Sequence, residues 1–288
     1  MRALRSLARH AWLLAAVGAA AACGAPANAG AAGPGFEVVT AQSPADSGTA
    51  KSARAVCPDG KRVVGTGGGV GAFVPGLIMT RVVPDTTLTS VTVTGREDGH
   101  GTPAQWAARA YAVCATPLPG LVLVSRSAPF DRRPAKSLFV ACPSGTRALS
   151  AGGWIEGAEG EVLLNTLGVR PSSRKHPERA VIAASAAGTG VTEAWRLHVF
   201  GICAAPPAGY AVVQRQSAPG SPPVQPVSGP SCPAGRHVVS VGGYVVFEES
   251  QVSLRHLVPA TSSVSVFAME DRDGAPGDWV VSAHAVCA

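Results

Sequence analysis

Apolar and polar side chains alternate strictly in three stretches of this chain, and each stretch ends on a cysteine. Between Trp106 and Cys114 every second residue is apolar, and Arg109 and Tyr111 fall on the opposite face. The same alternation recurs over residues 195–203 and 279–287. A period of two is typical of a β-strand with one buried face. The pattern therefore predicts three half-buried strands at corresponding places along the chain.

Shorter apolar runs lie upstream of each of these strands. The first set covers residues 62–66, 77–83 and 89–96, and equivalent runs end before Pro171 and Pro259. No segment after the first 29 residues shows a convincing amphipathic helical period, and the 34 glycines and 24 prolines recur between the strand runs. Frequent turn residues between short strand patterns favour an all-β fold.

The alternating strands close three copies of one longer repeat. Each copy contains Cys-Pro-x-Gly, then Gly-Gly ten residues after the cysteine, then a Trp eight residues before a second cysteine. The Cys-Pro-x-Gly turns occupy residues 57–60, 142–145 and 232–235. We expect repeats at 35–115, 120–204 and 209–288, each long enough for a small domain.

Two architectures fit this pattern. The first, which we favour, is three tandem small β-sandwiches, because each copy brings five or six strands and its own cysteine pair. The alternative is one three-sided β-prism to which the three repeats each contribute a sheet. In either case the Gly-Gly pair indicates a bulge or a close backbone approach. Trp106, Trp195 and Trp279 are expected in the core near the disulfides.

The first 29 residues differ in character from the rest. Arg2, Arg5 and Arg9 precede a twelve-residue apolar run that is too short to cross a bilayer, which is typical of an export signal. Its end has two interpretations. Residues 27–29 fit simple cleavage and secretion, whereas Cys23 follows a degenerate lipobox and would be the site of a lipid anchor.

The seven cysteines also indicate an exported protein. Setting Cys23 aside leaves six, an even number in an exported chain, which favours disulfides over metal ligands. Six cysteines allow fifteen pairings, and the internal similarity favours pairing within each repeat. The expected bonds join Cys57 to Cys114, Cys142 to Cys203 and Cys232 to Cys287.

Charge adds little. The leader holds three of the 24 basic residues and none of the 18 acids, so the remaining chain carries 21 minus 18, or +3. No basic block with interleaved aromatics appears, so nucleic acid is not an expected partner. Contact with a membrane is expected only through an anchor on Cys23.

The repeat resembles an uncharacterised module. The residues that carry the resemblance are Gly-aromatic-x-Val-Val, Ser-x-Pro, Lys-Ser before Cys-Pro-x-Gly, Gly-Gly and the final Trp-x₇-Cys-Ala. This order is similar to a module of exported hypothetical proteins from high-GC Gram-positive bacteria and of phage-tail-like or collagen-like proteins. The resemblance covers all three copies and implies an exterior setting, without catalytic residues. The third copy replaces Lys-Ser with Gln225-Pro226, which should weaken or reshape that strand.

Few residues suggest a catalytic, cofactor-binding or metal-binding role. The glycines after residue 65 lack the helix that a dinucleotide site requires, so no cofactor is expected. The histidines, among them His198, His237 and His284, occupy positions that we expect to be exposed on strands. They are not spaced as zinc ligands. Neither a metal nor catalytic residues are expected. The residues that differ between copies are the expected ligand contacts: Trp154, Tyr244, Glu97, Asp98, Glu270 and Asp271.

The sequence thus predicts a secreted or surface-anchored, non-enzymatic protein with a binding or structural role. A glycan or the cell wall is the expected extracellular partner. Two alternatives stay open: a self-assembling surface or tail-fibre-like protein, and a secreted hydrolase without a recognisable motif. The hydrolase alternative predicts that one copy gains a convergent polar cluster that the others lack.

Overall fold

Eighteen β-strands make up the described part of the chain. The structure is a computed structural model that describes residues 35–71, 73–171, 178–188, 190–246 and 251–288, so the expected leader (1–29) and Cys23 lie outside it. Six strands fall within each expected repeat. The first repeat holds β1 Glu37–Gln42, β2 Ala50–Val56, β3 Arg62–Val70, β4 Leu77–Pro84, β5 Ser90–Glu97 and β6 Ala108–Ala115. The second holds β7 Val122–Ser127, β8 Ala135–Ala141, β9 Arg147–Gly157, β10 Val162–Arg170, β11 Arg179–Ala186 and β12 Trp195–Ala204. The third holds β13 Ala211–Gln216, β14 Val224–Ser231, β15 Val238–Val246, β16 Val252–Pro259, β17 Ser263–Glu270 and β18 Val280–Cys287.

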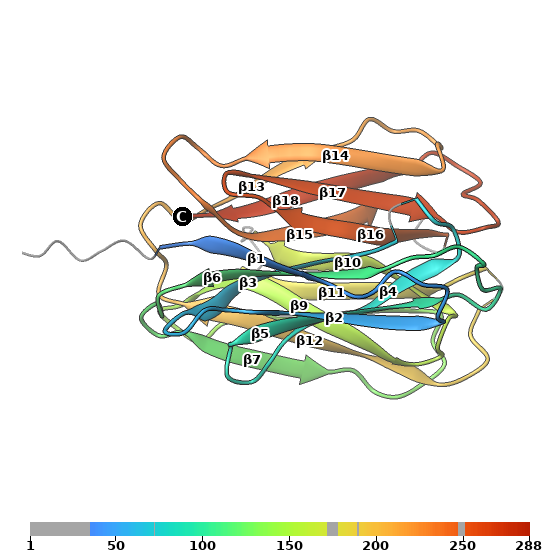
Figure 1. The fold of residues 1–288 in the computed structure, drawn as a ribbon, viewed down its shortest axis with the longest axis horizontal. Coiled ribbons are helices and arrows are strands. Elements are labelled where there is room, and N and C mark those ends of the chain that lie inside the picture. The colour runs from blue at the N-terminus through green and yellow to red at the C-terminus, as the bar shows by residue number, and fades with distance from the viewer. Residues whose placement is uncertain (1–34, 72, 172–177, 189, 247–250) are drawn as a thin grey trace, which may run out of the picture. The chain divides into compact units, whose positions relative to one another are not determined.

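Each repeat divides its strands between two sheets, and each sheet joins two repeats. The strand orders are β1-β6-β3-β16-β17-β14, β2-β5-β4-β9-β12-β7 and β13-β18-β15-β10-β11-β8. All the pairings are antiparallel. In Figure 1 the orange and red strands of the third repeat occur both beside the blue-green first repeat and beside the green and yellow second repeat.

The two expected architectures therefore coincide. Each repeat is a pair of three-stranded half-sheets, as in a small sandwich, and the half-sheets of neighbouring repeats merge so that three six-stranded sheets close a three-sided arrangement. The described residues all fall within one compact unit. The fold is all-β, as the sequence predicts, and among the described residues no helix is long and apolar enough to span a membrane.

The Gly-Gly pair explains how neighbouring repeats merge. Only two residue pairs join repeats at each junction, and each junction includes the second glycine: Gly68 with Leu257, Gly153 with Val82, and Gly243 with Leu167. A Cβ on the first glycine would also meet the neighbouring strand. It would lie 2.6 Å from the Leu257 carbonyl oxygen at Gly67 and 2.8 Å from the Val82 carbonyl oxygen at Gly152. The pair permits the close backbone approach that the sequence predicts.

A β-bulge at the start of the third strand of each repeat builds an apolar centre. The extra residues are Val64, Leu149 and Val239, and each is fully buried. They pack in one cluster with residues of all three repeats. Packing is tight there, because a Cβ on Gly65 would lie 1.7 Å from the Val239 carbonyl oxygen. This centre belongs to no single repeat, so the repeats share a core.

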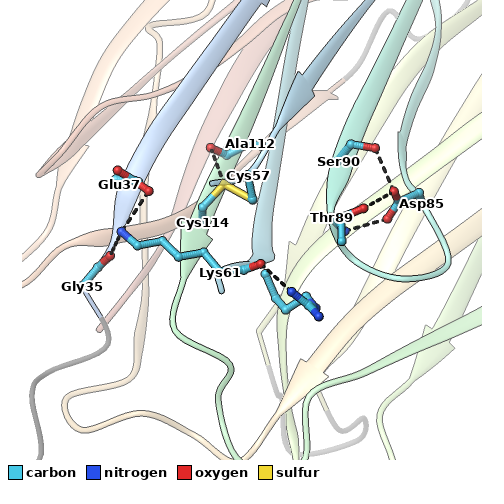
Figure 2. The surroundings of a disulfide bond; sticks show 10 residues. Gly35, Glu37, Cys57, Lys61, Asp85, Thr89, Ser90, Ala112 and Cys114 are labelled. Carbon is cyan, nitrogen blue, oxygen red and sulfur yellow. Dashed lines mark hydrogen bonds and ion pairs between the residues drawn. A yellow bond between two sulfur atoms is a disulfide. The ribbon is translucent and has the colours of Figure 1, made fainter. Parts of the chain in front are cut away.

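Disulfides close each repeat near the start of that third strand. The bonds are Cys57–Cys114, Cys142–Cys203 and Cys232–Cys287, which is the within-repeat pairing. Figure 2 shows the surroundings of the first bond, where the Lys61 ammonium lies 2.8 Å from the Glu37 carboxylate. In the turn between β4 and β5, the Asp85 carboxylate accepts hydrogen bonds from Thr89 and Ser90. We call this side of the molecule the disulfide end.

The three repeat tryptophans are buried, but they do not lie near the disulfides. Trp106 is 2% exposed, and Trp195 and Trp279 are completely buried. Each lies at or just before the start of its strand, eight positions ahead of the cysteine near the strand's end, which corresponds to about 26 Å of extended chain. The expectation that they pack beside the disulfides is therefore wrong. They close the opposite end of each sandwich, where their backbone amides bond to the chain just before the second strand.

A buried polar side chain in the second strand supports each of these tryptophans. Lys51 and Lys136 are 8% and 6% exposed and lie over the rings of Trp106 and Trp195. In the third repeat Gln225 takes this place and donates a hydrogen bond to the Trp279 carbonyl oxygen at 2.8 Å. The strand of Gln225, β14, contains a register shift that β2 and β8 lack. The altered approach to Cys232 is therefore reshaped, as expected.

Candidate functional site

A pocket lies at the end of the molecule opposite the disulfides. We call this the pocket end. Strand β5 begins beside Cys57 and ends at Glu97, just before the pocket residue Asp98. The pocket has a volume of about 370 Å³. That size falls in the usual range for small-molecule sites, roughly 300 to 1,000 Å³.

All three repeats contribute to this pocket through equivalent elements. Each supplies the start of its fourth strand and the loop between its fifth and sixth strands. The anchoring of that loop is also repeated, because the backbone amides of Asp98, Ala187 and Asp271 bond to carbonyl oxygens of Gly76, Glu161 and Gln251. One scaffold thus presents three loops of different sequence around one pocket.

Carboxylates dominate the polar lining. The five that line the pocket are Asp98, Glu161, Glu270, Asp271 and Asp273. Some already have partners. Glu161 accepts hydrogen bonds from the backbone amide and hydroxyl of Thr192, and Glu270 accepts one from the Trp279 indole at 2.8 Å.

The pKa of Asp271, one of these five carboxyls, is raised above its usual value. Burial raises its pKa to about 6, and repulsion from Asp273 and Asp98 acts in the same direction. Hydrogen bonds from the backbone amides of Asp273 and Gly274 oppose this shift. Near neutral pH the group is ionised at a cost, because its negative charge is poorly hydrated and faces other negative charges.

The basic side chains of the pocket are engaged by carbonyl oxygens. Arg272 donates a hydrogen bond to the Gly101 carbonyl oxygen and lies 3.8 Å from the Asp98 carboxylate. Arg255 occupies the bulge of β16 and is 1% exposed. Its guanidinium reaches the first repeat and donates to the carbonyl oxygens of Leu77 and Val74, both at 2.6 Å.

Arg255 remains charged at neutral pH although it is buried. Burial lowers the pKa of its guanidinium to about 10, and the negative charge of Asp98 partly offsets this effect. Among the described residues its Nε has no hydrogen-bond partner. A buried donor without an acceptor is costly, so the hydrogen bonds of the other guanidinium nitrogens to the first repeat offset only part of the cost of burying this side chain.

The structure separates the expected ligand contacts into three groups. Asp98, Glu270 and Asp271 meet in the pocket, although more than 170 positions separate the first of them from the others in the chain. Glu97 does not line the pocket. Glu161 and Arg255 could not be predicted from the sequence, because nothing local distinguishes a loop glutamate or a strand arginine until the repeats close around a common pocket.

The two aromatic candidates lie on sheet faces away from the pocket. Trp154 is half-buried between Arg81, 4.0 Å from its ring, and His198, whose ring centroid lies 4.5 Å away. Tyr244 is only 6% exposed and packs against His284, so it offers little surface to a ligand. His284 is itself buried, so its assignment as an exposed strand position was wrong.

A second polar cluster occurs on the sheet that carries Trp154. The His198 Nδ1 lies 2.7 Å from the Ser127 hydroxyl, and its Nε2 lies 2.6 Å from the Glu156 carboxylate. Arg196 also binds Glu156, and Arg196 and His198 lower the pKa of this carboxyl to about 2. The first and third repeats have Arg109 and Ser282 in place of His198. This cluster is therefore confined to the second repeat.

Within the described part of the chain, no group of three or more His, Cys, Asp or Glu side chains is close enough to hold a metal ion. The sequence matches no protein-family model, and it is not significantly similar to any curated protein. The function must therefore be argued from the site itself.

Proposed function

We propose that this chain is an exported, non-enzymatic binding protein whose pocket holds a small polar group of a glycan or of the cell wall. The observation that carries the proposal is the pocket itself, which three loops of unequal sequence form on an otherwise repeated scaffold. Carboxylates and arginines are the side chains that bind sugar hydroxyls and other polar groups in such sites.

An extracellular setting is consistent with the three disulfides, because such bonds persist in oxidising compartments. Export through the leader, and the choice between free secretion and a lipid on Cys23, are part of the proposal. The intact mass of the mature protein tests both. A mass matching cleavage after Ala29 indicates secretion, and a lipid mass on Cys23 indicates an anchor.

Binding is tested with insoluble peptidoglycan and a glycan array, using a variant that fills the pocket. Gly99 lines the pocket, and a side chain there meets nothing within 4 Å, so Gly99→Trp should block the site without disturbing the fold. Asp59→Trp places the same bulk at the exposed disulfide end as a control. We expect retention by the wild type and the control, and loss in Gly99→Trp. No retention of the wild type on any surface would overturn the proposal.

Hydrolysis is a second candidate function, supported by the Ser127–His198–Glu156 cluster. A serine hydroxyl bonded to a histidine that is held by a carboxylate is the arrangement of many nucleophilic hydrolases. However, Ser127 is exposed on an edge strand, and Arg196 shares the glutamate, so the same contacts also tie three strands together. A fluorophosphonate probe separates the two functions. Labelling that disappears in Ser127→Ala would favour the hydrolase, and no labelling is expected of a binding protein.

A further inference from the structure

The second strand of each repeat lies at the edge of a sheet. These strands are β2, β8 and β14, and each pairs with a neighbouring strand on one side only. An edge strand leaves every second N–H and C=O group free to pair with a further strand. Proteins usually prevent such pairing with a proline, a charged side chain or a bulge on the edge strand.

The backbone hydrogen bonds show which residues of β8 face away from the sheet. The Ala186 amide donates to the Pro134 carbonyl oxygen at 2.6 Å, so the backbone of Pro134 faces β11. In an antiparallel sheet the backbone groups of successive residues point to opposite sides of their strand. The free N–H and C=O groups of β8 are therefore those of Ala135, Ser137, Phe139 and Ala141.

The equivalent strands of the other two repeats are protected against pairing. In β14, Pro226 lacks an N–H group, the strand is bulged, and Arg215 donates a hydrogen bond to the Ser228 carbonyl oxygen at 3.2 Å. In β2, the charged Arg54 occupies one of the outward positions. None of the four outward residues of β8 is charged or a proline, and its pairing with β11 has no register shift. The second repeat therefore has an edge that is open to strand addition.

Exposed apolar side chains occur on the same edge. Five large apolar side chains are exposed among the described residues, and three of them belong to the two edge strands of the second repeat and the loop between these strands. They are Val122 on β7, Phe130 in the loop, and Phe139 on β8, which is 41% exposed. Apolar surface that gathers in one region of a protein often marks a contact with a partner.

Two arginines beside Phe139 indicate the charge of that partner. The guanidinium carbons of Arg179 and Arg126 lie 4.2 Å and 5.8 Å from the centre of the Phe139 ring. Among the described residues neither guanidinium forms an ion pair or a hydrogen bond. Pairing of β8 with β8 of a second copy would bring the arginines of both copies together, and like charges on paired strands repel. A segment that carries carboxylates is the complementary partner.

We propose that the open edge of β8 binds an extended acidic segment of another protein, which adds a further strand to this sheet. The outward N–H and C=O groups of Ser137 and Phe139 bond to the backbone of the segment. Apolar side chains of the segment cover Phe139, and its carboxylates pair with Arg126 and Arg179. This site is separate from the pocket, so the inference does not depend on the function proposed for the pocket.

Selection from a random peptide library displayed on phage, with the mature protein as bait, tests the inference. We expect enriched peptides that are rich in Asp and Glu and poor in Pro. Fluorescence anisotropy then measures the affinity of the most enriched peptide. Ser137→Pro should weaken it at least tenfold, because the change removes an outward N–H that Pro226 already lacks in the third repeat. Ser52→Pro, the same change at the equivalent position of β2, is the matched control and should leave the affinity unchanged.

A second variant tests the charge without altering the backbone. Arg126→Gln combined with Arg179→Gln should weaken the peptide at least tenfold at low salt and reduce the salt dependence of its affinity. Gly99→Trp should bind the peptide like the wild type, because the pocket is not involved. Failure to enrich any peptide, enriched peptides without an acidic bias, or equal affinity in Ser137→Pro and the wild type would overturn the inference. Polyphosphate that binds wild type and Ser137→Pro equally and displaces the peptide would also overturn it. None of these results would affect the function proposed for the pocket.

Discussion

The three repeats are similar at the disulfide end of this molecule and differ from one another at the pocket end. At the disulfide end the repeats share the same turn, the same cystine and an apolar bulge residue at Val64, Leu149 and Val239, although the strand before Cys232 is reshaped. At the pocket end the repeats diverge. The bulges of the fourth strands hold three different polar residues, Thr80, Asn165 and Arg255.

This contrast has a physical cause. The bulge residues at the disulfide end pack against one another in a shared core, so each must be apolar and of suitable size. The loops at the pocket end carry exposed residues such as His100 and Asp273, whose polar side chains keep their hydration, so their sequence can vary at little cost to folding. We therefore expect stability to be concentrated at the disulfide end, and we propose ligand recognition at the pocket end.

Removing a disulfide should give the largest effect on stability. The chain-entropy model assigns roughly 4 kcal/mol to a bond that closes a loop of this length, and the Cys57–Cys114 bond spans 57 residues. Cys57→Ala combined with Cys114→Ala should lower the free energy of unfolding by about that amount. Denaturant titration measures it. Ligand affinity at the pocket should be unchanged in the folded variant. A parallel loss of affinity would show that stability and ligand binding are not divided between the two ends.

Gly65→Ala should be the next most damaging change. Its Cβ would lie 1.7 Å from the Val239 carbonyl oxygen, so two strands of different repeats must move apart. Overpacking of this kind costs about 3 kcal/mol or more. Gly99→Ala is the matched control, since its Cβ meets nothing within 4 Å. Comparable thermal unfolding of the two variants would contradict the shared core.

Acid should destabilise the third repeat through two histidines that are shielded from solvent, the buried His284 and the half-buried His256. Burial lowers the pKa of both His256 and His284 to about 4. Between about pH 6.5 and pH 4 the unfolded chain binds protons that the folded chain does not, so the free energy of unfolding falls as the pH is lowered. Each histidine contributes about 2 kcal/mol to this loss.

His284→Phe isolates the effect, because Phe200 occupies the same position in the second repeat. Urea unfolding at pH 7 and pH 4.5 should show a smaller loss of stability in His284→Phe than in the wild type. The exposed His237 provides a control, His237→Gln, that should retain the full loss. Identical losses in all three proteins would contradict the assignment.

Asp271→Asn should have the smallest effect on stability, and its sign is opposite to that of the other changes. The folded pKa of about 6 lies above the ordinary value of 3.8, so stability falls as the pH rises through this interval. Removing the charge should raise the free energy of unfolding at pH 7 by up to about 1 kcal/mol, because the group is partly exposed to solvent. The gain should vanish at pH 3.5, and a loss at pH 7 would show that Asp271 stabilises the loop.

The sequence predicted the features that local pattern determines. Period-two alternation identified the strands that end at Cys114, Cys203 and Cys287, and the spacing of the glycine pair indicated the close approach now seen at Gly67 and Gly152. The merging of repeats across two residue pairs was beyond such reasoning, because it depends on which strands meet in three dimensions.

The candidate site was predicted only in part, for the same reason. Comparing the copies singled out Asp98, Glu270 and Asp271, since the second copy has alanines in their place. Arg255 could not be recognised, because its role arises from carbonyl oxygens of another repeat. The position of Trp106 was misjudged because a residue on the same strand face as a cysteine can still lie at the far end of that strand.

Hydrogen exchange with and without soluble peptidoglycan fragments tests the division between the two ends most directly. At saturating fragment concentration, peptides that contain Asp98, Glu161 and Asp271 should gain protection, while those covering the turns at 57–60, 142–145 and 232–235 should not change. Protection confined to the disulfide end or to the sheet faces, or no protection at all, would contradict the assignment of recognition to the pocket end.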